Sequence, residues 1–240
     1  MVMKNRSETF FTEDEKQSIE ASIKEAESRT SGEIVTMVVE QSDGYRDTDV
    51  TTGILAAALL SIYPAELFFA NSEFLIRKFI PSMSWFSQIP DETRFTAGLL
   101  LFISLTVILT FPLKMIFRKF PLLKKFIITA KRMDEEVKER ALRGFHEHGL
   151  GNTKDSTGVL FLISIFEKKV QILADHGIYS KIKQETLDRY ASSVGKGIAS
   201  GKGGEALCTA IKEIGNELEK HFPRSHDDRN ELRDSLVTEK

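Results

Sequence analysis

Apolar residues gather in the middle of the chain, and charged residues dominate on both sides of it. Residues 95–113 contain no charged side chain, and Leu, Ile, Phe, Val and Thr predominate there. At a rise of 1.5 Å per residue, a helix of this length reaches about 28 Å, close to the thickness of the hydrocarbon layer of a membrane. The pattern therefore predicts a transmembrane helix at about 95–114.

A second, shorter apolar run lies before it. Residues 50–65 carry no charge, and Glu66 is followed directly by further apolar side chains. A charged side chain costs about 2.5–3.5 kcal/mol at the middle of a bilayer and far less near its surface, so we place Glu66 at the far end of this span. We expect a transmembrane helical hairpin within 50–117, with helices at about 50–70 and 95–114. The alternative is a hairpin buried inside a soluble protein, which a chain of 240 residues could hardly cover on all sides.

Lysine and arginine gather on one side of this hairpin. The connection between the two spans carries Arg77, Lys78 and Arg94, whereas the stretch after the second span carries more basic residues and no acid. These are Lys114, Arg118, Lys119, Lys124, Lys125, Lys131 and Arg132. Because basic residues near a span stay on the cytoplasmic side, we expect a multi-pass protein of the cell inner membrane with both termini in the cytoplasm. Aromatic and aliphatic residues are interleaved with these cations, which is typical of a segment that lies on an anionic lipid leaflet.

Outside the hairpin, the periodicity predicts alternating helices and strands. Thr12 and Glu15 form a capping box at the start of a helical pattern. A β-branched run follows, and two further strand patterns are joined by a tight turn. In chain order we expect a helix at about 12–29, a strand at 34–41, a helix at 133–148, strands at 157–165 and 169–174, and helices at 187–198 and 207–222.

This order of elements predicts the α/β class, with a small mixed β-sheet flanked by helices and interrupted by the two-helix hairpin. A crossover should join the first two strands in parallel, and the tight turn should join the next two in antiparallel fashion. Neither polar part of the chain has a sufficient core alone, so residues 10–43 and 130–222 should dock into one domain. Residues 223–240 are charged and aperiodic, and we expect them to form a tail.

Composition and charge exclude some classes of function. The chain has 33 Lys and Arg against 35 Asp and Glu, so no overall positive field attracts nucleic acid, and we expect no nucleic-acid partner. The single cysteine, Cys208, excludes an intramolecular disulfide and any metal site built from several cysteines. It lies next to the apolar stripe of the last helix, which favours a small packed side chain over a nucleophile. No set of nucleophile, base and orienting acid emerges from the spacing of residues.

Three carboxylates are expected at one end of the predicted sheet. If the strands pair as described above, Glu33, Asp155 and Asp175 all come to the same end. Oxygen ligands suit a hard cation such as Ca²⁺, so this end of the sheet is a candidate metal site. Solvated carboxylates that cap the strand ends are the alternative interpretation.

Short motifs in both polar parts carry a family resemblance. They are Ser31-Gly32-Glu33-Ile34 after the first helix, Tyr45 beyond the first strand, Thr157-Gly158-Val159-Leu160 at the start of the hairpin strands, Ala174-Asp175-His176-Gly177-Ile178 at their end, and His221-Phe222-Pro223 after the last helix. Together they resemble the TPM family, which is named for a thylakoid lumen protein, a photosystem II repair factor and a receptor modulator. Two spans inserted after the first strand resemble the bacterial membrane subgroup of that family.

The resemblance implies a small mixed sheet flanked by helices and several kinds of function. Some family members are acid phosphatases, some bind calcium, and others assist the assembly or repair of membrane complexes. Asp175 matches the aspartate that follows the last hairpin strand in the family. We therefore expect a binding or assembly module of the membrane, with the lipid bilayer and membrane proteins as partners and a divalent-cation site at Asp175, Asp155 and Glu33. The alternative is a metal-assisted acid phosphatase that uses the same end of the sheet, although no arginine nearby in the sequence would bind phosphate.

Overall fold

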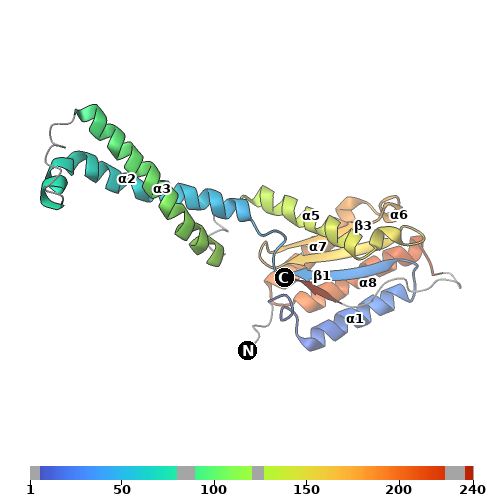
Figure 1. Cartoon of the computed structure of the whole chain (residues 1–240). Coiled ribbons are helices and arrows are strands. Elements are labelled where there is room, and N and C mark those ends of the chain that lie inside the picture. Colours follow the sequence, from blue (N-terminus) through green and yellow to red (C-terminus); the bar gives the residue numbers. More distant parts are fainter. Residues whose placement is uncertain (1–5, 80–89, 121–126, 225–235, 240) are drawn as a thin grey trace. The chain divides into compact units, whose positions relative to one another are not determined.

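A computed structural model describes residues 6–79, 90–120, 127–224 and 236–239 (Figure 1). The chain divides into two compact units. The first unit combines Met1–Gly44 with Ala130–Lys240 and holds the β-sheet, and we call it the sheet domain. The second unit is Tyr45–Thr129 and holds two long helices, which we call the hairpin.

A mixed sheet with strand order β3-β2-β1-β4 forms the centre of the sheet domain. The strands are β1 (Glu33–Val39), β2 (Gly158–Ser164), β3 (Lys169–Ala174) and β4 (Val237–Glu239). β1 and β2 run parallel, with Glu33 opposite Gly158, and β2 and β3 run antiparallel. The expected α/β fold with a mixed sheet is therefore confirmed, including the pairing of its first three strands.

Helices cover both faces of this sheet (Figure 1). One face packs against α1 (Glu13–Glu27), α7 (Gln184–Ala199) and α8 (Gly203–His221), and the other packs against α5 (Ala130–Glu147). Two short helices complete the domain, η2 (Leu150–Asn152) before β2 and α6 (His176–Tyr179) after β3.

The alternation of side chains along β1 explains why both layers form. Ile34 and Val38 join the core under α1, α7 and α8, whereas Val35, Met37 and Val39 join the core under α5. Successive side chains of a strand point to opposite faces of the sheet, so a strand covered on both sides reads as a continuous apolar run. Every residue of β1 and β2 is buried as a result.

α8 carries the largest share of the core from the helical layer. Leu207, Ile211, Ile214 and Leu218 recur at helical spacing on one side of α8, and none of them is exposed. Burying each such side chain stabilises the fold by about 1.5–3 kcal/mol. α8 contacts α1 on one side and α7 on the other, so the last helix of the domain fixes the first helix in place.

The expectation that residues 223–240 form only a tail is wrong at its end. Val237–Glu239 forms β4, which adds to the free edge of β1 in parallel. Leu236 and Val237 also pack against the two cores of the domain. A strand of three residues is too short to show an alternation of apolar and polar side chains. Its pairing with β1 uses backbone groups, so it does not depend on the charge of the preceding segment.

The hairpin consists of α2 (Arg46–Phe79) and α3 (Asp91–Lys119). α2 includes a kink at Asn71, where the backbone leaves helical geometry. Two candidate membrane spans, Arg46–Asn71 and Asp91–Lys119, are long and apolar enough to cross a bilayer by length and composition. Lys124 and Lys125 of the basic stretch lie outside the described residues.

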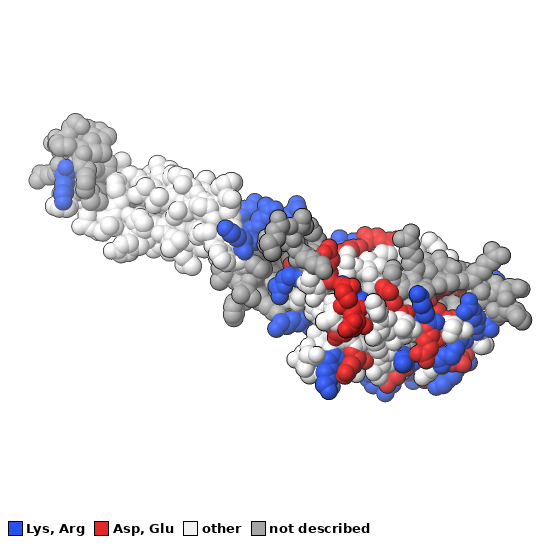
Figure 2. Space-filling view, turned by 90° about the horizontal axis from the view of Figure 1, so that it is seen from below, with Lys and Arg blue, Asp and Glu red and all other residues white. Residues whose placement is uncertain are grey.

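Most large apolar side chains of the described part of the hairpin are exposed. Leu59 is 70 % exposed on α2, and Val107 and Phe111 are 68 % and 71 % exposed on α3. Figure 2 shows a long stretch of the visible face of the hairpin without a charged residue. α2 approaches the backbone of α3 closely at Gly53, where a Cβ would lie only 3.2 Å from the backbone nitrogen and from Cβ of Lys114. Close backbone approach at small residues is typical of helices that pair in a membrane.

Candidate functional site

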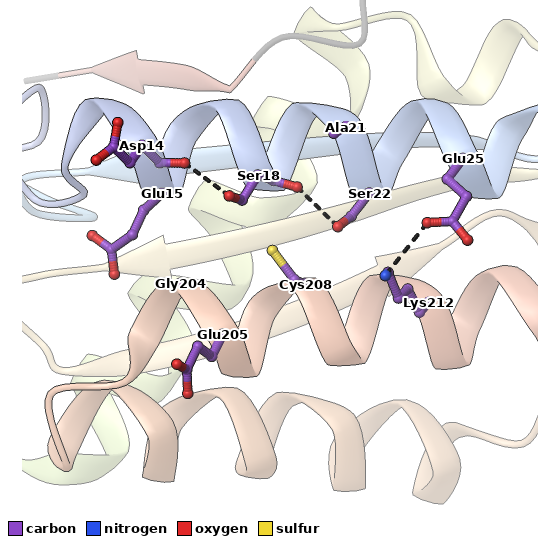
Figure 3. A pocket seen from close by; sticks show the side chains of 10 residues that line it. All are labelled: Asp14, Glu15, Ser18, Ala21, Ser22, Glu25, Gly204, Glu205, Cys208 and Lys212. Carbon is purple, nitrogen blue, oxygen red and sulfur yellow. Dashed lines mark hydrogen bonds and ion pairs between the residues drawn. The ribbon is translucent and has the colours of Figure 1, made fainter.

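A groove between α1 and α8 is the candidate binding surface of the sheet domain (Figure 3). Its volume is about 510 Å³. α1 lines it with Asp14, Glu15, Ser18, Ala21, Ser22 and Glu25, and α8 lines it with Gly204, Glu205, Cys208 and Lys212. We call it the α1–α8 groove. Its volume falls within the range of small-molecule pockets.

Two glycines of α8 set how closely the helices approach. A Cβ on Gly215 would lie 2.7 Å from Cβ of Ala26, and a Cβ on Gly204 would lie 2.7 Å from Cγ of Glu15. A side chain on Gly215 would therefore push α8 away from α1, whereas one on Gly204 would displace the side chain of Glu15. The helices are held close on both sides of Cys208, and the α1–α8 groove lies over their line of contact.

Small side chains form the floor of the groove. Ser18 Oγ donates a hydrogen bond to the backbone oxygen of Asp14, and Ser22 Oγ donates to that of Ser18, each at 2.9 Å. The sulfur of Cys208 points toward α1 from the opposite helix (Figure 3). Cys208 is partly buried and packs against the core, which agrees with the expected small packed side chain.

The charges around the groove are mostly negative. Glu25 and Lys212 form an ion pair at 3.4 Å, but both side chains are about half exposed, so the pair stabilises the fold by at most about 1 kcal/mol. Glu15 accepts hydrogen bonds from the backbone N–H and the hydroxyl of Thr12 in the expected capping box. With Asp14 and Glu205, the groove presents four carboxylates against one lysine, a surface that attracts a cationic segment.

The pattern of apolar and polar residues does not predict this groove. Its signal is a repeat of small residues four apart, Ser18 and Ser22 on one helix and Gly204 and Cys208 on the other. Serine, glycine and cysteine are neither strongly apolar nor charged, so they do not stand out when apolar and polar positions are compared. The groove also depends on contact between the first and last helices of the domain, which local spacing does not reveal.

The predicted carboxylate site lies at the end of the sheet where β1 and β2 begin. Asp175 is the N-cap of α6, and the N–H of His176 donates to its Oδ1 at 2.6 Å. The backbone N–H of Asp175 donates to the oxygen of Gly158 at 2.9 Å, while the N–H of Glu33 donates to the oxygen of Thr157 at 3.2 Å. The structure thus brings the three predicted positions to the same end of the sheet.

Tight loops hold this end together. A Cβ on Gly177 would lie 2.8 Å from the backbone oxygen of Asp155 and 2.6 Å from that of Ser156. Ser156 has a positive φ of 53°, and the hydroxyl of Thr157 donates to the oxygen of Ser31 at 2.8 Å. The loops before β1, before β2 and after β3 are therefore in direct contact.

The three carboxylates nevertheless do not form one coordination group. Glu33 is only 6 % exposed and lies on the same face of β1 as Val35 and Met37, whereas Asp155 is exposed. No group of three or more His, Cys, Asp or Glu side chains is placed to hold a metal ion in the part of the chain that the structure describes. The set therefore does not fit Ca²⁺ as it stands. Metal binding by Asp175 stays a prediction.

A buried polar network closes the opposite end of the sheet. Glu167, in the turn between β2 and β3, accepts hydrogen bonds from the hydroxyl of Ser164 and, at 3.1 Å, from the N–H of Ser42. Ser42 Oγ donates to Ser164 Oγ at 3.0 Å, and all three residues are buried. The network fixes the chain just before it leaves the sheet domain for the hairpin.

Glu136 of α5 lies among charged groups near the same segment. Burial, and then the nearby negative charge of Asp43, raise the pKa of the Glu136 carboxyl above its ordinary value. The negative charge of Glu139 also raises this pKa. Two arginines lower it without cancelling the rise: Arg132, whose Nε lies 3.6 Å from Oε1 of Glu136, and Arg143.

Comparison with known proteins agrees with the fold. Residues 124–217 match the family described as TPM domain. No curated protein matches the chain significantly. The NMR structure of the BA42 protein from the psychrophilic bacterium Bizionia argentinensis has a TM-score of 0.53 and 18 % identity, over 99 % of this chain and 98 % of that one, so the likeness supports the fold alone. The segment at 124–217 of this chain therefore matches the TPM domain family, and the similar structure agrees with that match in its fold.

Proposed function

We propose that this chain is a binding or assembly module anchored in the cell inner membrane, with α2 and α3 as its anchor. The observation that carries the proposal is the exposure of large apolar side chains along both helices. In the most apolar part of α3, no described residue is buried. Apolar surface of this extent on a monomeric soluble protein would promote aggregation, whereas a bilayer covers it.

The same proposal places both termini in the cytoplasm. Lys114, Arg118 and Lys119 lie at the C-terminal end of α3, whereas its N-terminal turn carries Asp91 and Glu92. The positive-inside rule then puts the end of α3 that leads to the sheet domain on the cytoplasmic side. The sheet domain would meet other membrane proteins from that side.

The α1–α8 groove is the surface that we assign to partner proteins. Its carboxylates, at Asp14, Glu15, Glu25 and Glu205, favour a basic segment of a partner, and its floor of small side chains gives that segment room to approach. No phosphate-binding arginine lines it in the described structure.

Membrane anchoring is tested by extraction and by topology. After expression with an epitope tag, the chain should stay in membranes washed with alkaline carbonate and should leave them only with detergent. In a Cys208→Ala background, a single cysteine at the exposed position Lys181 should react with an impermeant maleimide in inverted vesicles and not in intact spheroplasts. Release by carbonate would refute the anchor, and labelling in spheroplasts would refute the orientation.

Partner binding is tested by site-specific photocrosslinking in the same membranes. A benzophenone side chain at Ser18, in the groove, should give discrete protein adducts that disappear when Asp14→Lys and Glu205→Lys are combined. The control position is Ser192, exposed on α7 and outside the groove. Identical adducts from both positions, or none that depend on the acidic residues, would contradict binding in the groove.

Phosphomonoester hydrolysis at the Asp175 end of the sheet is the second candidate function. One observation favours it: Oδ2 of Asp175 is buried without a hydrogen-bond partner in the described structure, while Oδ1 is held by the N–H of His176. An oxygen in this state has capacity for a proton or a cation. Hydrolysis of a generic phosphomonoester by the purified protein, with and without a chelator, tests this candidate.

A further inference from the structure

The hairpin has a pocket of its own, formed only by α2 and α3. It has a volume of about 300 Å³ and lies between Ile62–Phe69 of α2 and Phe95–Phe102 of α3. Its walls are almost entirely apolar, and three of the side chains that form them are phenylalanines, Phe69, Phe95 and Phe102. Phe69 and Phe95 meet edge to face, with ring centroids 6.1 Å apart. We call it the hairpin pocket.

One carboxylate interrupts this apolar lining. Glu66 lines the hairpin pocket and is exposed, and none of the described residues donates a hydrogen bond to it or forms an ion pair with it. The pocket's other rim residues are also open to the surroundings, since Ile62, Phe95 and Leu99 are 50 %, 62 % and 47 % exposed. The pocket therefore opens on the outer surface of the hairpin, with a negative charge at its rim.

Glu66 lies close to one end of the candidate span of α2. The candidate span of α2 ends at Asn71, five residues beyond Glu66, which is about 8 Å along a helix. The pocket continues from Glu66 toward Ile62, away from that end and into the span. A ligand with a cationic head and an apolar chain would fit this arrangement, because the head would meet Glu66 while the chain enters the pocket.

We infer that the hairpin pocket binds a membrane phospholipid whose head group carries a primary ammonium, with the ammonium paired to Glu66 and part of an acyl chain in the pocket. The inference rests on the proposed membrane anchor. A primary ammonium supplies N–H donors as well as charge, so it can form charge-assisted hydrogen bonds to a carboxylate, which a quaternary choline cannot.

Other occupants fit these residues less well. A transmembrane helix of a partner would dock on a stripe of small residues, but bulky rings form much of this wall. A second copy that docked through the same face would bring two Glu66 carboxylates together, and their like charges would repel each other.

The inference is tested with photoactivatable lipids. The full chain is reconstituted in vesicles of phosphatidylcholine and phosphatidylglycerol that contain a trace of one probe with a diazirine in its acyl chain. Three such probes are compared in separate vesicles. Their head groups are ethanolamine, choline and glycerol, and they are otherwise identical. We expect the ethanolamine probe to label α2 and α3 around the hairpin pocket about threefold more than the other two.

Variants separate the two parts of the lipid. Glu66→Gln should reduce labelling by the ethanolamine probe to the choline level, because the amide carries no charge. Leu99→Trp should fill the pocket and reduce labelling by all three probes. Glu92→Gln, which removes a carboxylate of α3 outside the pocket, should change nothing.

Each outcome decides a separate question. Equal labelling by the three probes, or an ethanolamine preference that survives Glu66→Gln, would overturn the inference while the anchor stands. Absence of hairpin labelling by every probe, together with release of the chain by carbonate, would overturn the anchor and the lipid site at once.

Discussion

Met37 in β1 pairs in parallel register with Val237 in β4, at the far end of the chain. The pairing extends along both strands, and the N–H of Glu40 donates to the backbone oxygen of Glu239 at 3.2 Å. The carboxylate of Glu239 also forms an ion pair with Arg140 of α5. β4 therefore covers the edge of β1 that would otherwise offer unpaired backbone groups to another chain.

Removal of residues 236–240 should expose that edge. The amide of Glu40 loses its acceptor, so its hydrogen exchange should accelerate about fivefold, the effect of one hydrogen bond of about 1 kcal/mol. The amide of Glu33 donates to Thr157 at the other end of β1 and serves as the internal control. Exchange measured in detergent by mass spectrometry or NMR checks both, and an unchanged rate at Glu40 would show that β4 does not protect β1.

Most of the sheet domain could be predicted because its elements bury continuous or periodic apolar faces. The β-branched run from Ile34 to Val39 is typical of a buried strand, and the apolar stripe from Leu207 to Leu218 is typical of a helix packed on one side. β4 could not be predicted in this way. Its three residues pair with β1 through the backbone and show no pattern of apolar side chains.

The sites were less accessible to sequence reasoning. Strand pairing alone places Asp155 near Asp175, and the structure agrees at the level of the backbone. Strand pairing does not fix the direction of each side chain. Glu33 is buried on the same face of β1 as Val35, whereas Asp155 lies in a loop that bends at the positive φ of Ser156. The α1–α8 groove depends on tertiary contact between distant helices, and the repeat of small residues on each helix does not say that these two helices meet.

Two glycine substitutions should change stability in opposite directions. A Cβ on Gly158 would lie 2.4 Å from the backbone oxygen of Leu150, so Gly158→Ala should destabilise the sheet domain by about 1–3 kcal/mol. Gly195 lies inside α7 with open space where its Cβ would be, so Gly195→Ala should stabilise the domain by about 0.5–1 kcal/mol. Thermal unfolding of both variants in detergent, followed by circular dichroism, is the measurement. A stable Gly158→Ala variant would mean that the loop before β2 can move away.

Asp175→Asn should separate the structural role of this residue from a chemical one. The amide oxygen of asparagine still accepts a hydrogen bond from the N–H of His176, and Asn is among the preferred N-cap residues, so the melting temperature should change little. If the sheet end hydrolyses phosphomonoesters, the rate should fall at least about tenfold, because removal of one catalytic group typically costs that much or more. A rate that is independent of both this substitution and a chelator would exclude catalysis by Asp175.

Glu136 makes the stability of the sheet domain depend on pH. A carboxyl whose pKa is higher in the folded than in the unfolded chain binds its proton more tightly when folded. The folded state therefore holds more protons in the window between the ordinary and the raised pKa. As pH rises through this window, Glu136 lowers the free energy of unfolding, and the loss persists at every higher pH.

Glu136→Gln should remove this loss. At pH 7 the variant should unfold at a higher temperature than the natural chain, because an uncharged side chain no longer faces burial and the charge of Asp43. Well below the ordinary pKa, both chains carry an uncharged side chain here and should unfold alike. Glu135→Gln is the matched control, since Glu135 is the preceding residue of α5 and its side chain is 59 % exposed, in an ion pair with Lys131. A gain from Glu136→Gln that is equal at both pH values, or that Glu135→Gln reproduces, would show that the effect does not come from the raised pKa of Glu136.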